Sequence, residues 1–375
     1  MSGIYFHIPF CNSKCNYCDF YSRRGLEGID ELIKCELVEL NLRKEYIGNE
    51  VITTIYFGGG TPSLLSINQI NKLLDTVRHL FVISNECEIT FEANPEDLTG
   101  EYLFQLFRLG INRLSIGMQS FNNETLKFLG RRHDNSRASY IIETAKNSGF
   151  ENISVDLIFG IPGMSYENYI CSLNEVINLN IQHVSAYLLT IENNTYLYKL
   201  FKNNKLCDVS ENDLLTQFND TIDILNENGF FQYEISNYAK PGFISRHNSS
   251  YWEDISYLGI GPSSHSYNKI SRQWNISNTM KYCNYINQSK LFYEIEWLSE
   301  IDKFNEYIIK GLRTAKGIST LYISTNFNDE ICRNFNSNVN KILKEGLIIL
   351  EDETIKLTRK GFFLSDFVMR TFHYV

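Results

Sequence analysis

Short apolar runs alternate with longer amphipathic stretches over the first half of the chain. The apolar runs are rich in β-branched and aromatic residues and predict buried strands. They cover residues 3–8, 53–57, 87–93, 111–118, 152–160 and 183–190. Helical periodicity fills the intervals at residues 29–46, 67–81, 101–109, 124–129 with 136–148, and 166–179. Repeated β-α alternation predicts an α/β fold with a parallel sheet and helices outside it, and six units predict a partial (β/α)6 TIM-like barrel.

The pattern changes after about residue 230. Residues 231–298 are rich in aromatics, Gly, Ser and His and predict strands with irregular loops. Residues 299–375 predict three helices, a hairpin that turns at 351–353, and a last helix, which together suggest a winged-helix-like domain. This last part holds eleven Lys and Arg against ten Asp and Glu, too balanced for a DNA-reading surface. We therefore expect domains at 1–230, 231–298 and 299–375, the last of them a lid or partner surface.

Polar residues follow the predicted barrel strands where each strand ends. Gly58 to Thr61 follow the second strand, Glu92 closes the third, Gln119 follows the fourth, and Asp156 lies within the fifth. The carboxyl ends of barrel strands carry the chemistry of α/β barrels, so these positions should line one mouth. Three clustered cysteines follow the first strand and are expected at the same mouth.

Composition narrows the class of protein. The chain has 43% hydrophobic residues, enough for a sizeable core, and a formal net charge of −9, which argues against nucleic acid as a main partner. No stretch approaches the roughly 18 apolar residues of a membrane span. The first ten residues resemble neither a signal peptide nor a transit peptide. We expect a cytoplasmic protein.

The clustered cysteines, Cys11, Cys15 and Cys18, are spaced C-x3-C-x2-C, while the other six of the nine are scattered. Thiolates bind soft metals, so zinc and an iron–sulfur cluster are both candidates. A structural zinc site wants four protein ligands, and no second pair follows at zinc-finger spacing. A cubane cluster also wants four ligands. Three cysteines on one loop would hold three irons and leave the fourth open for a substrate or cofactor.

This cysteine spacing after the first barrel strand resembles the radical S-adenosylmethionine (SAM) superfamily. The resemblance implies a [4Fe–4S] cluster on Cys11, Cys15 and Cys18, whose open iron takes the amine and carboxylate of SAM. One electron from the cluster then cleaves the sulfonium and releases a 5′-deoxyadenosyl radical. A zinc-binding or merely reactive loop remains the alternative, because short motifs carry false positives.

Further motifs resemble the coproporphyrinogen-oxidase-like branch of that superfamily. "YFGGGTPS" matches its glycine motif, and "FEANPE", "IGMQSF", "LGRRH" and "VDLIFGIP" match its polar SAM contacts. Each residue alone is more often a turn, a strand-end hydrogen bonder or a packing aromatic. The resemblance implies SAM contacts at Tyr5, Tyr17, Gly59, Gly60, Thr61, Glu92, Gln119, Arg131 and Asp156. One departure is Met164, where many relatives carry Gln, which puts any polar role there in doubt.

Within the branch, the chain is most similar to the HemW-type heme chaperones. Phe20 stands where the oxygen-independent coproporphyrinogen III dehydrogenases carry a fourth Cys, and "HNSSYW" matches the chaperones' H-N-x-x-Y-W motif. The resemblance implies heme contacts at His247, Tyr251 and Trp252, with His247 as candidate iron ligand. Histidine is a common axial ligand and aromatics offer flat apolar area to a porphyrin. An ordinary loop histidine is the competing interpretation, and His265 and His7 are weaker candidates.

Two functions therefore compete. The first is a heme chaperone that binds heme and transfers it to acceptor proteins, with SAM either cleaved or acting as a conformational effector. The second is an oxygen-independent coproporphyrinogen III dehydrogenase, a radical enzyme that decarboxylates porphyrinogen propionates. Phe20 and His247 favour the first. A radical enzyme acting on an unrelated substrate also survives, because fold does not determine function. The resemblance implies heme-accepting apoproteins and an electron donor such as flavodoxin or ferredoxin as partners.

Overall fold

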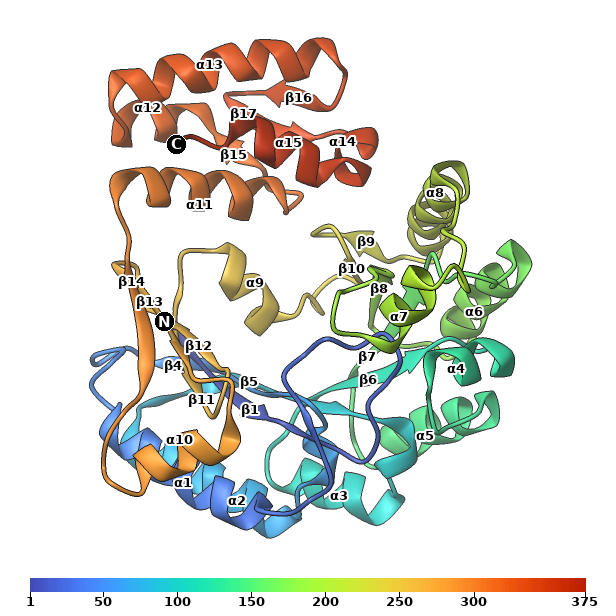
Figure 1. The fold of residues 1–375 in the computed structure, drawn as a ribbon, viewed down its shortest axis with the longest axis vertical. Helices are drawn as coiled ribbons and strands as arrows, with labels where there is room; N and C mark the ends of the chain where they lie inside the picture. The colour runs from blue at the N-terminus through green and yellow to red at the C-terminus, as the bar shows by residue number, and fades with distance from the viewer.

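One large sheet organises most of the protein. The computed structural model describes residues 1–375 and contains a twelve-stranded sheet in the order β14-β13-β12-β11-β1-β4-β5-β6-β7-β8-β10-β9 (Figure 1). Its six predicted strands are β1 (Ser2–Ile8), β4 (Ile52–Gly59), β5 (Ile83–Ala93), β6 (Arg113–Gln119), β7 (Asn152–Phe159) and β8 (His183–Leu188). Neighbours among these six pair in parallel. The prediction of a parallel six-stranded partial barrel is confirmed.

Helices between these strands cover the outer face of the sheet (Figure 1). They are α1 (Ile29–Leu42), α2 (Ile67–Leu80), α3 (Gly100–Arg108), α4 (Asn123–Leu129), α5 (Asn135–Asn147) and α6 (Tyr166–Asn178). N-terminal caps explain where two of these helices begin. Ser66 forms a capping box with Gln69 before α2, and the Asp134 side chain accepts a hydrogen bond from the Arg137 backbone N–H before α5. These helices agree with the sequence periodicity, although α1 ends four residues earlier than predicted.

Residues after 189 extend the sheet at both edges. Strands β9 (Phe231–Gln232) and β10 (Asn237–Ala239) continue it beyond β8. Strand β11 (Ser256–Ile260) pairs in parallel with β1, and β12 (His265–Tyr267), β13 (Ser271–Asn275) and β14 (Tyr293–Trp297) follow antiparallel. Helices α7 (Tyr196–Lys202) and α8 (Glu211–Glu227) connect β8 to β9, α9 (Arg246–Trp252) lies between β10 and β11, and α10 (Thr279–Ile286) lies between β13 and β14. The partial barrel thus gains a seventh parallel strand, β11, which the sequence pattern did not predict.

The C-terminal part is built around a second hydrophobic core. Its helices are α11 (Glu300–Leu312), α12 (Thr320–Asn326), α13 (Asp329–Lys344), α14 (Arg359–Phe363) and α15 (Ser365–Phe372). Its three-stranded sheet runs β15 (Ile318–Ser319), β17 (Thr354–Leu357), β16 (Ile348–Glu351). A core of 16 buried residues, from Phe304 to Phe372, is separate from the 54-residue core of the large sheet. The predicted helices and hairpin are confirmed, and the separate core favours the predicted boundary at residue 299, which stays a prediction.

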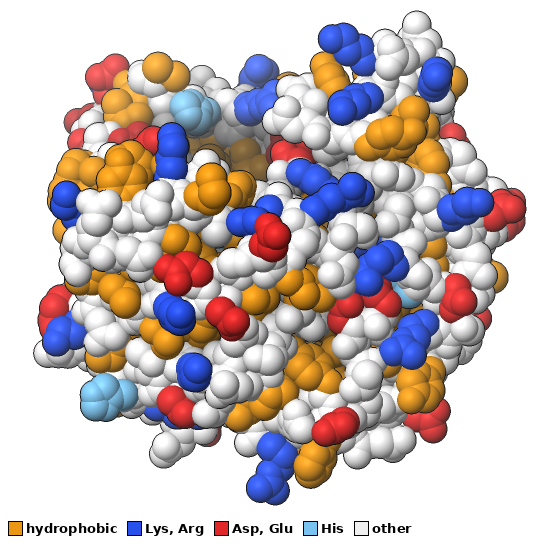
Figure 2. Space-filling model, turned by 60° about the horizontal axis from the view of Figure 1, so that its bottom comes forward, with side chains coloured by type: hydrophobic (Ala, Val, Ile, Leu, Met, Phe, Trp, Pro, Cys, Tyr) orange, Lys and Arg blue, Asp and Glu red, His pale blue; other side chains and the backbone are white.

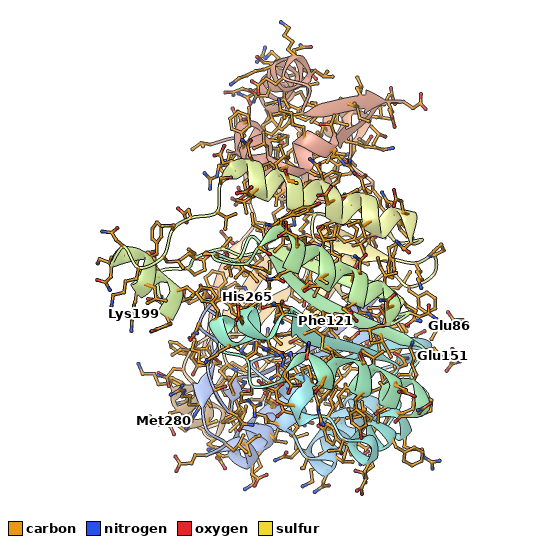
Figure 3. All side chains as sticks on the ribbon, turned by 90° about the vertical axis from the view of Figure 1, so that its right-hand side faces the viewer. Glu86, Phe121, Glu151, Lys199, His265 and Met280 are labelled. Atoms are coloured by element: carbon orange, nitrogen blue, oxygen red, sulfur yellow. The ribbon has the colours of Figure 1, made fainter.

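The surface mixes charges of both signs. Figure 2 shows Lys, Arg, Asp and Glu scattered among hydrophobic side chains, with a hollow on this face bordered by hydrophobic and basic groups. None of the helices combines the length and the apolar composition needed to cross a membrane. Figure 3 shows the two ends of the barrel strands: Glu86 and Glu151, near the amino ends of β5 and β7, lie opposite Lys199 of α7.

Candidate functional site

The three clustered cysteines lie at the carboxyl ends of the parallel strands. Cys11 belongs to the short strand β2 (Phe10–Cys11), and Cys15 and Cys18 follow on the same loop. All three line a pocket of about 550 Å³. The other predicted residues in its wall are Tyr17, Gly59, Gly60, Thr61, Glu92, Gln119, Arg131 and Asp156. The fold therefore brings eleven of the twelve predicted cluster and SAM residues to one pocket, and Tyr5 lies outside its lining.

Two polar side chains contact the thiols directly. The Thr61 hydroxyl donates to Cys11 Sγ at 3.4 Å, and Arg131 Nη1 donates to Cys15 Sγ at 3.5 Å. Arg131 is itself held by Asn94 Oδ1 at 2.6 Å and by the Gly117 carbonyl at 2.7 Å. The fixed guanidinium therefore places a positive charge beside the Cys15 sulfur.

Burial works against ionisation at the third cysteine. It raises the pKa of the Cys18 thiol to about 11. The Phe20 backbone N–H partly offsets this by donating a hydrogen bond to the sulfur. A metal that binds Cys18 must therefore displace a proton, which couples metal loading to pH.

The donor set fits a multi-iron cluster better than one ion. No three His, Cys, Asp or Glu side chains converge where a single metal ion would sit. The three thiols instead stand around one pocket. In a cubane each cysteine binds a different iron, so three thiols that line one pocket without meeting at one point suit a cluster. This geometry fits zinc less well, because a zinc ion needs its ligands around one point.

The glycines after β4 are required by close packing as well as by any ligand. Gly59 has φ of +107°, and a Cβ there would lie 2.8 Å from the His7 ring. A Cβ on Gly60 would lie 2.8 Å from the carbonyl oxygens of Ile8 and Phe10. The loop after β4 therefore presses its backbone against the chain leading to the cysteines. Larger residues would push the two loops apart.

Two acids lie deeper in the same pocket. Burial raises the pKa of Glu92 to about 7, although Tyr56 donates a hydrogen bond to Glu92 Oε1 at 2.7 Å. Burial also raises the pKa of Asp156, which accepts from the Ser115 hydroxyl at 3.3 Å. Gln119 adopts φ of +67°, an uncommon conformation for a non-glycine residue that turns the chain at the end of β6. Both acids would recognise the amine or hydroxyls of a polar ligand.

Aromatic residues surround the loop in two different ways. The Tyr5 hydroxyl shares a 3.2 Å hydrogen bond with His7 Nδ1, and His7 Nε2 lies 3.0 Å from the Tyr21 carbonyl oxygen. Tyr5 and His7, both on β1, thus connect this strand to the chain just after the cysteines. Phe20 lines the pocket and is 69% exposed, so no second wall covers the position where dehydrogenases carry a fourth cysteine.

The HNSSYW motif forms helix α9 rather than the predicted irregular loop. Ser245 caps it by accepting from the Asn248 N–H, a signal that the sequence analysis overlooked. His247 and Tyr251 are one helical turn apart and face the barrel. His247 is 0% exposed, with Nδ1 2.8 Å from the Thr54 hydroxyl and Nε2 2.9 Å from the Tyr251 hydroxyl. Burial lowers its pKa to about 3, so the ring stays neutral.

Both ring nitrogens of His247 are therefore engaged, and its role as an iron ligand stays a prediction. The ring also stacks on Tyr56 at 4.9 Å between centroids. Trp252, at the end of α9, turns the other way and lines a different cavity. His265 is exposed on β12 and stacks on Trp274 at 6.0 Å. Within the motif, His247 therefore packs against the barrel, whereas Trp252 faces the second cavity.

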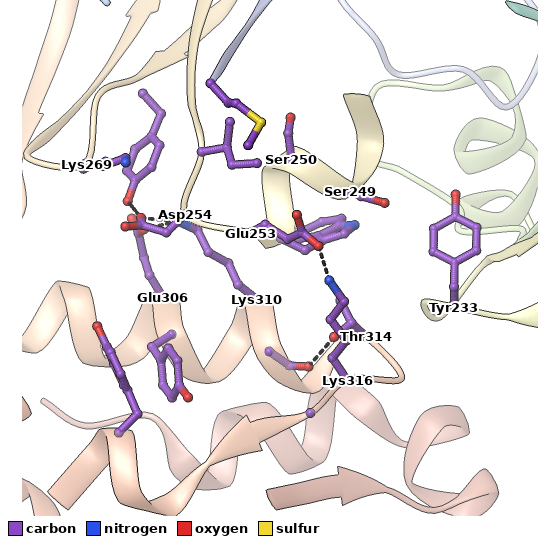
Figure 4. Close-up of a pocket in the computed structure, with 18 of the residues that line it drawn as sticks. Tyr233, Ser249, Ser250, Glu253, Asp254, Lys269, Glu306, Lys310, Thr314 and Lys316 are labelled. Carbon is purple, nitrogen blue, oxygen red and sulfur yellow. Dashed lines mark hydrogen bonds and ion pairs between the residues drawn. The ribbon is translucent and has the colours of Figure 1, made fainter. Parts of the chain in front are cut away.

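That second cavity lies at the opposite end of the barrel strands. It measures about 1270 Å³ and is bordered by α9, α11, the start of β4 at Thr53 and Thr54, and the loop from Thr314 to Gly317 (Figure 4). The sequence pattern does not predict this cavity, because it forms only where the C-terminal unit packs against the large sheet.

One residue of the first pocket was also missed. Asn94 joins the two thiol contacts, since it accepts from Arg131 and donates to the Thr61 hydroxyl at 3.3 Å. Its place two residues after Glu92, immediately beyond β5, is the same strand-end signal that identified Glu92.

Two family models match the chain. The radical SAM superfamily model matches residues 5–200, and the HemN C-terminal domain model matches residues 298–364. The first covers the strands and the pocket with the three cysteines. The second covers most of the unit with the separate core.

Relatives match over most or all of the chain. The chain is 32% identical to the heme chaperone HemW of Bacillus subtilis (strain 168) over 376 residues, 99% of both chains. It is 39% identical to the heme chaperone HemW of Escherichia coli (strain K12) over 265 residues, 70% of this chain and 69% of that one. Among solved structures, coproporphyrinogen III oxidase (HemN) from Escherichia coli superposes with a TM-score of 0.88 at 23% identity, covering 99% of this chain and 90% of that one. At this identity the structural likeness shows the fold alone.

Proposed function

Because the chain belongs to the heme chaperone HemW family of the radical SAM superfamily, we propose that it binds heme and passes it to acceptor apoproteins. The observation that carries the proposal is the full-length match to these chaperones combined with Phe20 and the α9 motif. We propose further that Cys11, Cys15 and Cys18 hold a [4Fe–4S] cluster. An electron donor of the flavodoxin or ferredoxin class would then reduce it.

The residues around the thiols support a cofactor with an amine and a carboxylate. Bound SAM would supply a sulfonium that one electron can cleave. Thr61 and Arg131 would hold the thiolates, and the Gly59–Gly60 backbone would approach the methionine part of SAM. Glu92 and Asp156 would take its amine or ribose hydroxyls, and Tyr17 and Gln119 would complete the wall. Tyr5, which lies outside the lining, would act through its hydrogen bond with His7. Phe20 leaves the loop with three cysteines, so one coordination position stays open.

The alternative is radical decarboxylation of coproporphyrinogen III. The likeness to coproporphyrinogen III oxidase does not favour it, because it reaches only the fold. Phe20 argues against it, since the dehydrogenases extend the motif to a fourth cysteine at this position.

One incubation separates the two functions. The protein is reconstituted anaerobically with iron and sulfide and given SAM, a reductant and coproporphyrinogen III. We expect no protoporphyrinogen above the level of a Cys15→Ala control. Hemin added to the same preparation should give a shifted Soret band. Protoporphyrinogen formation would contradict the chaperone proposal, and so would the absence of any heme binding.

A further inference from the structure

We propose that the cavity between α9 and α11 is where the porphyrin sits, and that it recognises the ring plane and carboxylates of the porphyrin rather than its iron. This inference rests on the proposed function, since it assumes that the chain takes up a porphyrin. It assigns the site to the amino ends of the barrel strands, away from the cysteine pocket.

The cavity has the size for such a ligand. Its volume of about 1270 Å³ exceeds the roughly 300–1,000 Å³ of ordinary small-molecule pockets. Helix α9 and the residues that follow it form one wall, and α11, the loop from Thr314 to Gly317 and α12 form the other (Figure 4). A flat macrocycle between these walls would contact both α9 and the C-terminal unit at once.

Aromatic side chains line both walls. Trp252 and Tyr267 come from the large sheet and its connections, while Tyr307, Tyr322 and Phe327 come from the C-terminal unit. Tyr307 and Tyr322 stack on each other with centroids 4.4 Å apart. The indole N–H of Trp252 is buried and has no acceptor. A buried donor without a partner is costly, so a ligand with an acceptor group near Trp252 would relieve that cost.

Two lysines of the cavity have no counter-ion. Lys269 and Lys303 line it and make no ion pair, whereas Lys310 pairs with Glu306 at 2.8 Å and Lys316 pairs with Glu253. Both free lysines are exposed, which places them at the rim. Carboxylates on the edge of a macrocycle would meet them there in charge-assisted hydrogen bonds.

The iron has no histidine in this cavity. No His or Cys side chain belongs to its lining. His247 faces the barrel, with both nitrogens bonded to Thr54 and Tyr251. It is therefore a positioning residue: it fixes α9 to β4 so that Trp252 faces the cavity.

Titration of the full-length protein with three porphyrins tests the mode of recognition, followed by intrinsic tryptophan fluorescence. Hemin and metal-free protoporphyrin IX should bind with dissociation constants within about threefold of each other. Protoporphyrin IX dimethyl ester, which has no carboxylate, should bind more weakly. Hemin binding more than about tenfold tighter than protoporphyrin IX would overturn recognition without iron.

Variants test the residues. The double variant Lys269→Glu and Lys303→Glu should weaken both free acids about tenfold and leave the ester unchanged. Lys341→Glu makes the same charge change on α13, outside the cavity, and should have no effect. Trp252→Ala should weaken all three ligands. Equal binding in the lysine double variant and the parent would overturn the rim assignment.

His247 gives a separate readout. His247→Ala should weaken hemin and protoporphyrin IX equally and leave the Soret maximum of bound hemin where it is in the parent. His247→Gln, which can still bond to Thr54, should restore much of the binding. Loss of hemin binding with protoporphyrin IX binding intact, or a moved Soret maximum, would make His247 the iron ligand instead.

The outcomes separate this inference from the proposed function. If no porphyrin binds at all, the heme chaperone proposal fails. If hemin binds and neither Trp252→Ala nor the lysine double variant weakens it, the proposed function stands and the cavity assignment fails.

Discussion

The two ends of the barrel are built in different ways. At the carboxyl ends, a pocket of about 550 Å³ takes its wall from the loop after β1 and from residues in or just after β4, β5, β6, β7 and β8. At the amino ends, a cavity of about 1270 Å³ takes its wall from α9 with the segment after it and from the C-terminal unit, which has a core of its own. Sites in α/β barrels belong to the carboxyl ends. A cavity at the other end is therefore a property of the added C-terminal unit.

The difference also concerns rigidity. The cysteine pocket is held by backbone pressed on backbone at Gly60 and by the fixed side chain of Arg131. The cavity is crossed by exposed contacts such as Lys316 to Glu253 and by the Arg313 guanidinium over the Trp252 ring at 4.6 Å. The first end is therefore held by packed backbone, whereas side-chain contacts span the second.

The largest expected effect is loss of the metal centre. Cys11→Ala, Cys15→Ala or Cys18→Ala should each reduce the iron and sulfide content from about four of each per chain to a small fraction, because a cubane that loses one of three protein ligands is exposed to solvent. Cys207→Ala, at an exposed cysteine far along the chain, is the matched control. Iron and sulfide analysis after anaerobic reconstitution gives the answer, and a full cluster in any of the three variants would refute the ligand assignment.

Removing a packed side chain from the second core should affect porphyrin binding at the amino ends but not cluster content at the carboxyl ends. Phe335 is 1% exposed and packs against Phe304 and Phe372, so Phe335→Ala should cost the C-terminal unit about 3–5 kcal/mol of unfolding free energy. We expect porphyrin binding to be lost while cluster content stays normal.

Leu321→Ala, at a side chain that is 58% exposed in the same unit, should leave both properties unchanged. Thermal unfolding and iron analysis on the same samples check this. If cluster content fell with Phe335→Ala, the two ends would not be independent.

Ionisation of Glu92 in the cysteine pocket should destabilise the folded protein as pH rises. Glu92 has a pKa of about 7 in the folded state against an ordinary value of 4.5, so the folded state holds the proton more tightly. Its contribution to stability is complete below the lower value and is lost as pH rises through 7. Glu92→Gln stays neutral, so from pH 5 to pH 8 it should gain up to about 3 kcal/mol relative to the parent.

Urea unfolding at both pH values measures this difference. The same variant should bind SAM less well, since stability gained at a ligand site is often paid in function. A parent and a variant with the same pH slope would mean that Glu92 is ionised in the folded state.

The smallest effect is expected at the exposed pair across the cavity. Lys316→Ala removes the contact with Glu253, and exposed ion pairs contribute roughly 0–1 kcal/mol, so the thermal midpoint should change little. A large drop would show that the cavity is held shut by charge. Salt titration of the parent gives an independent check, because screening weakens such a pair.

Much of the cysteine pocket was predictable from sequence, because its residues follow the strands that the apolar pattern marks. Glu92, Gln119 and Asp156 can be assigned to one pocket because the carboxyl ends of parallel barrel strands meet at one mouth. The α9 motif was different. Its residue types suggested a heme contact, but periodicity over seven residues was too short to reveal a helix, and only tertiary packing separates buried His247 from cavity-lining Trp252.

The pairing of β1 with β11 has a consequence for synthesis. Residues Ser2 to Phe6 of β1 pair with Ser256 to Ile260 of β11. During synthesis β1 is made first, and its partner β11 follows about 250 residues later in the chain. At ribosomal speeds of about 5–20 residues per second, that edge stays open for on the order of tens of seconds. The cysteine loop follows β1 directly. During that interval the loop with the three cysteines is carried beside a strand whose β11 edge is free, and such an open edge can pair with the wrong strand.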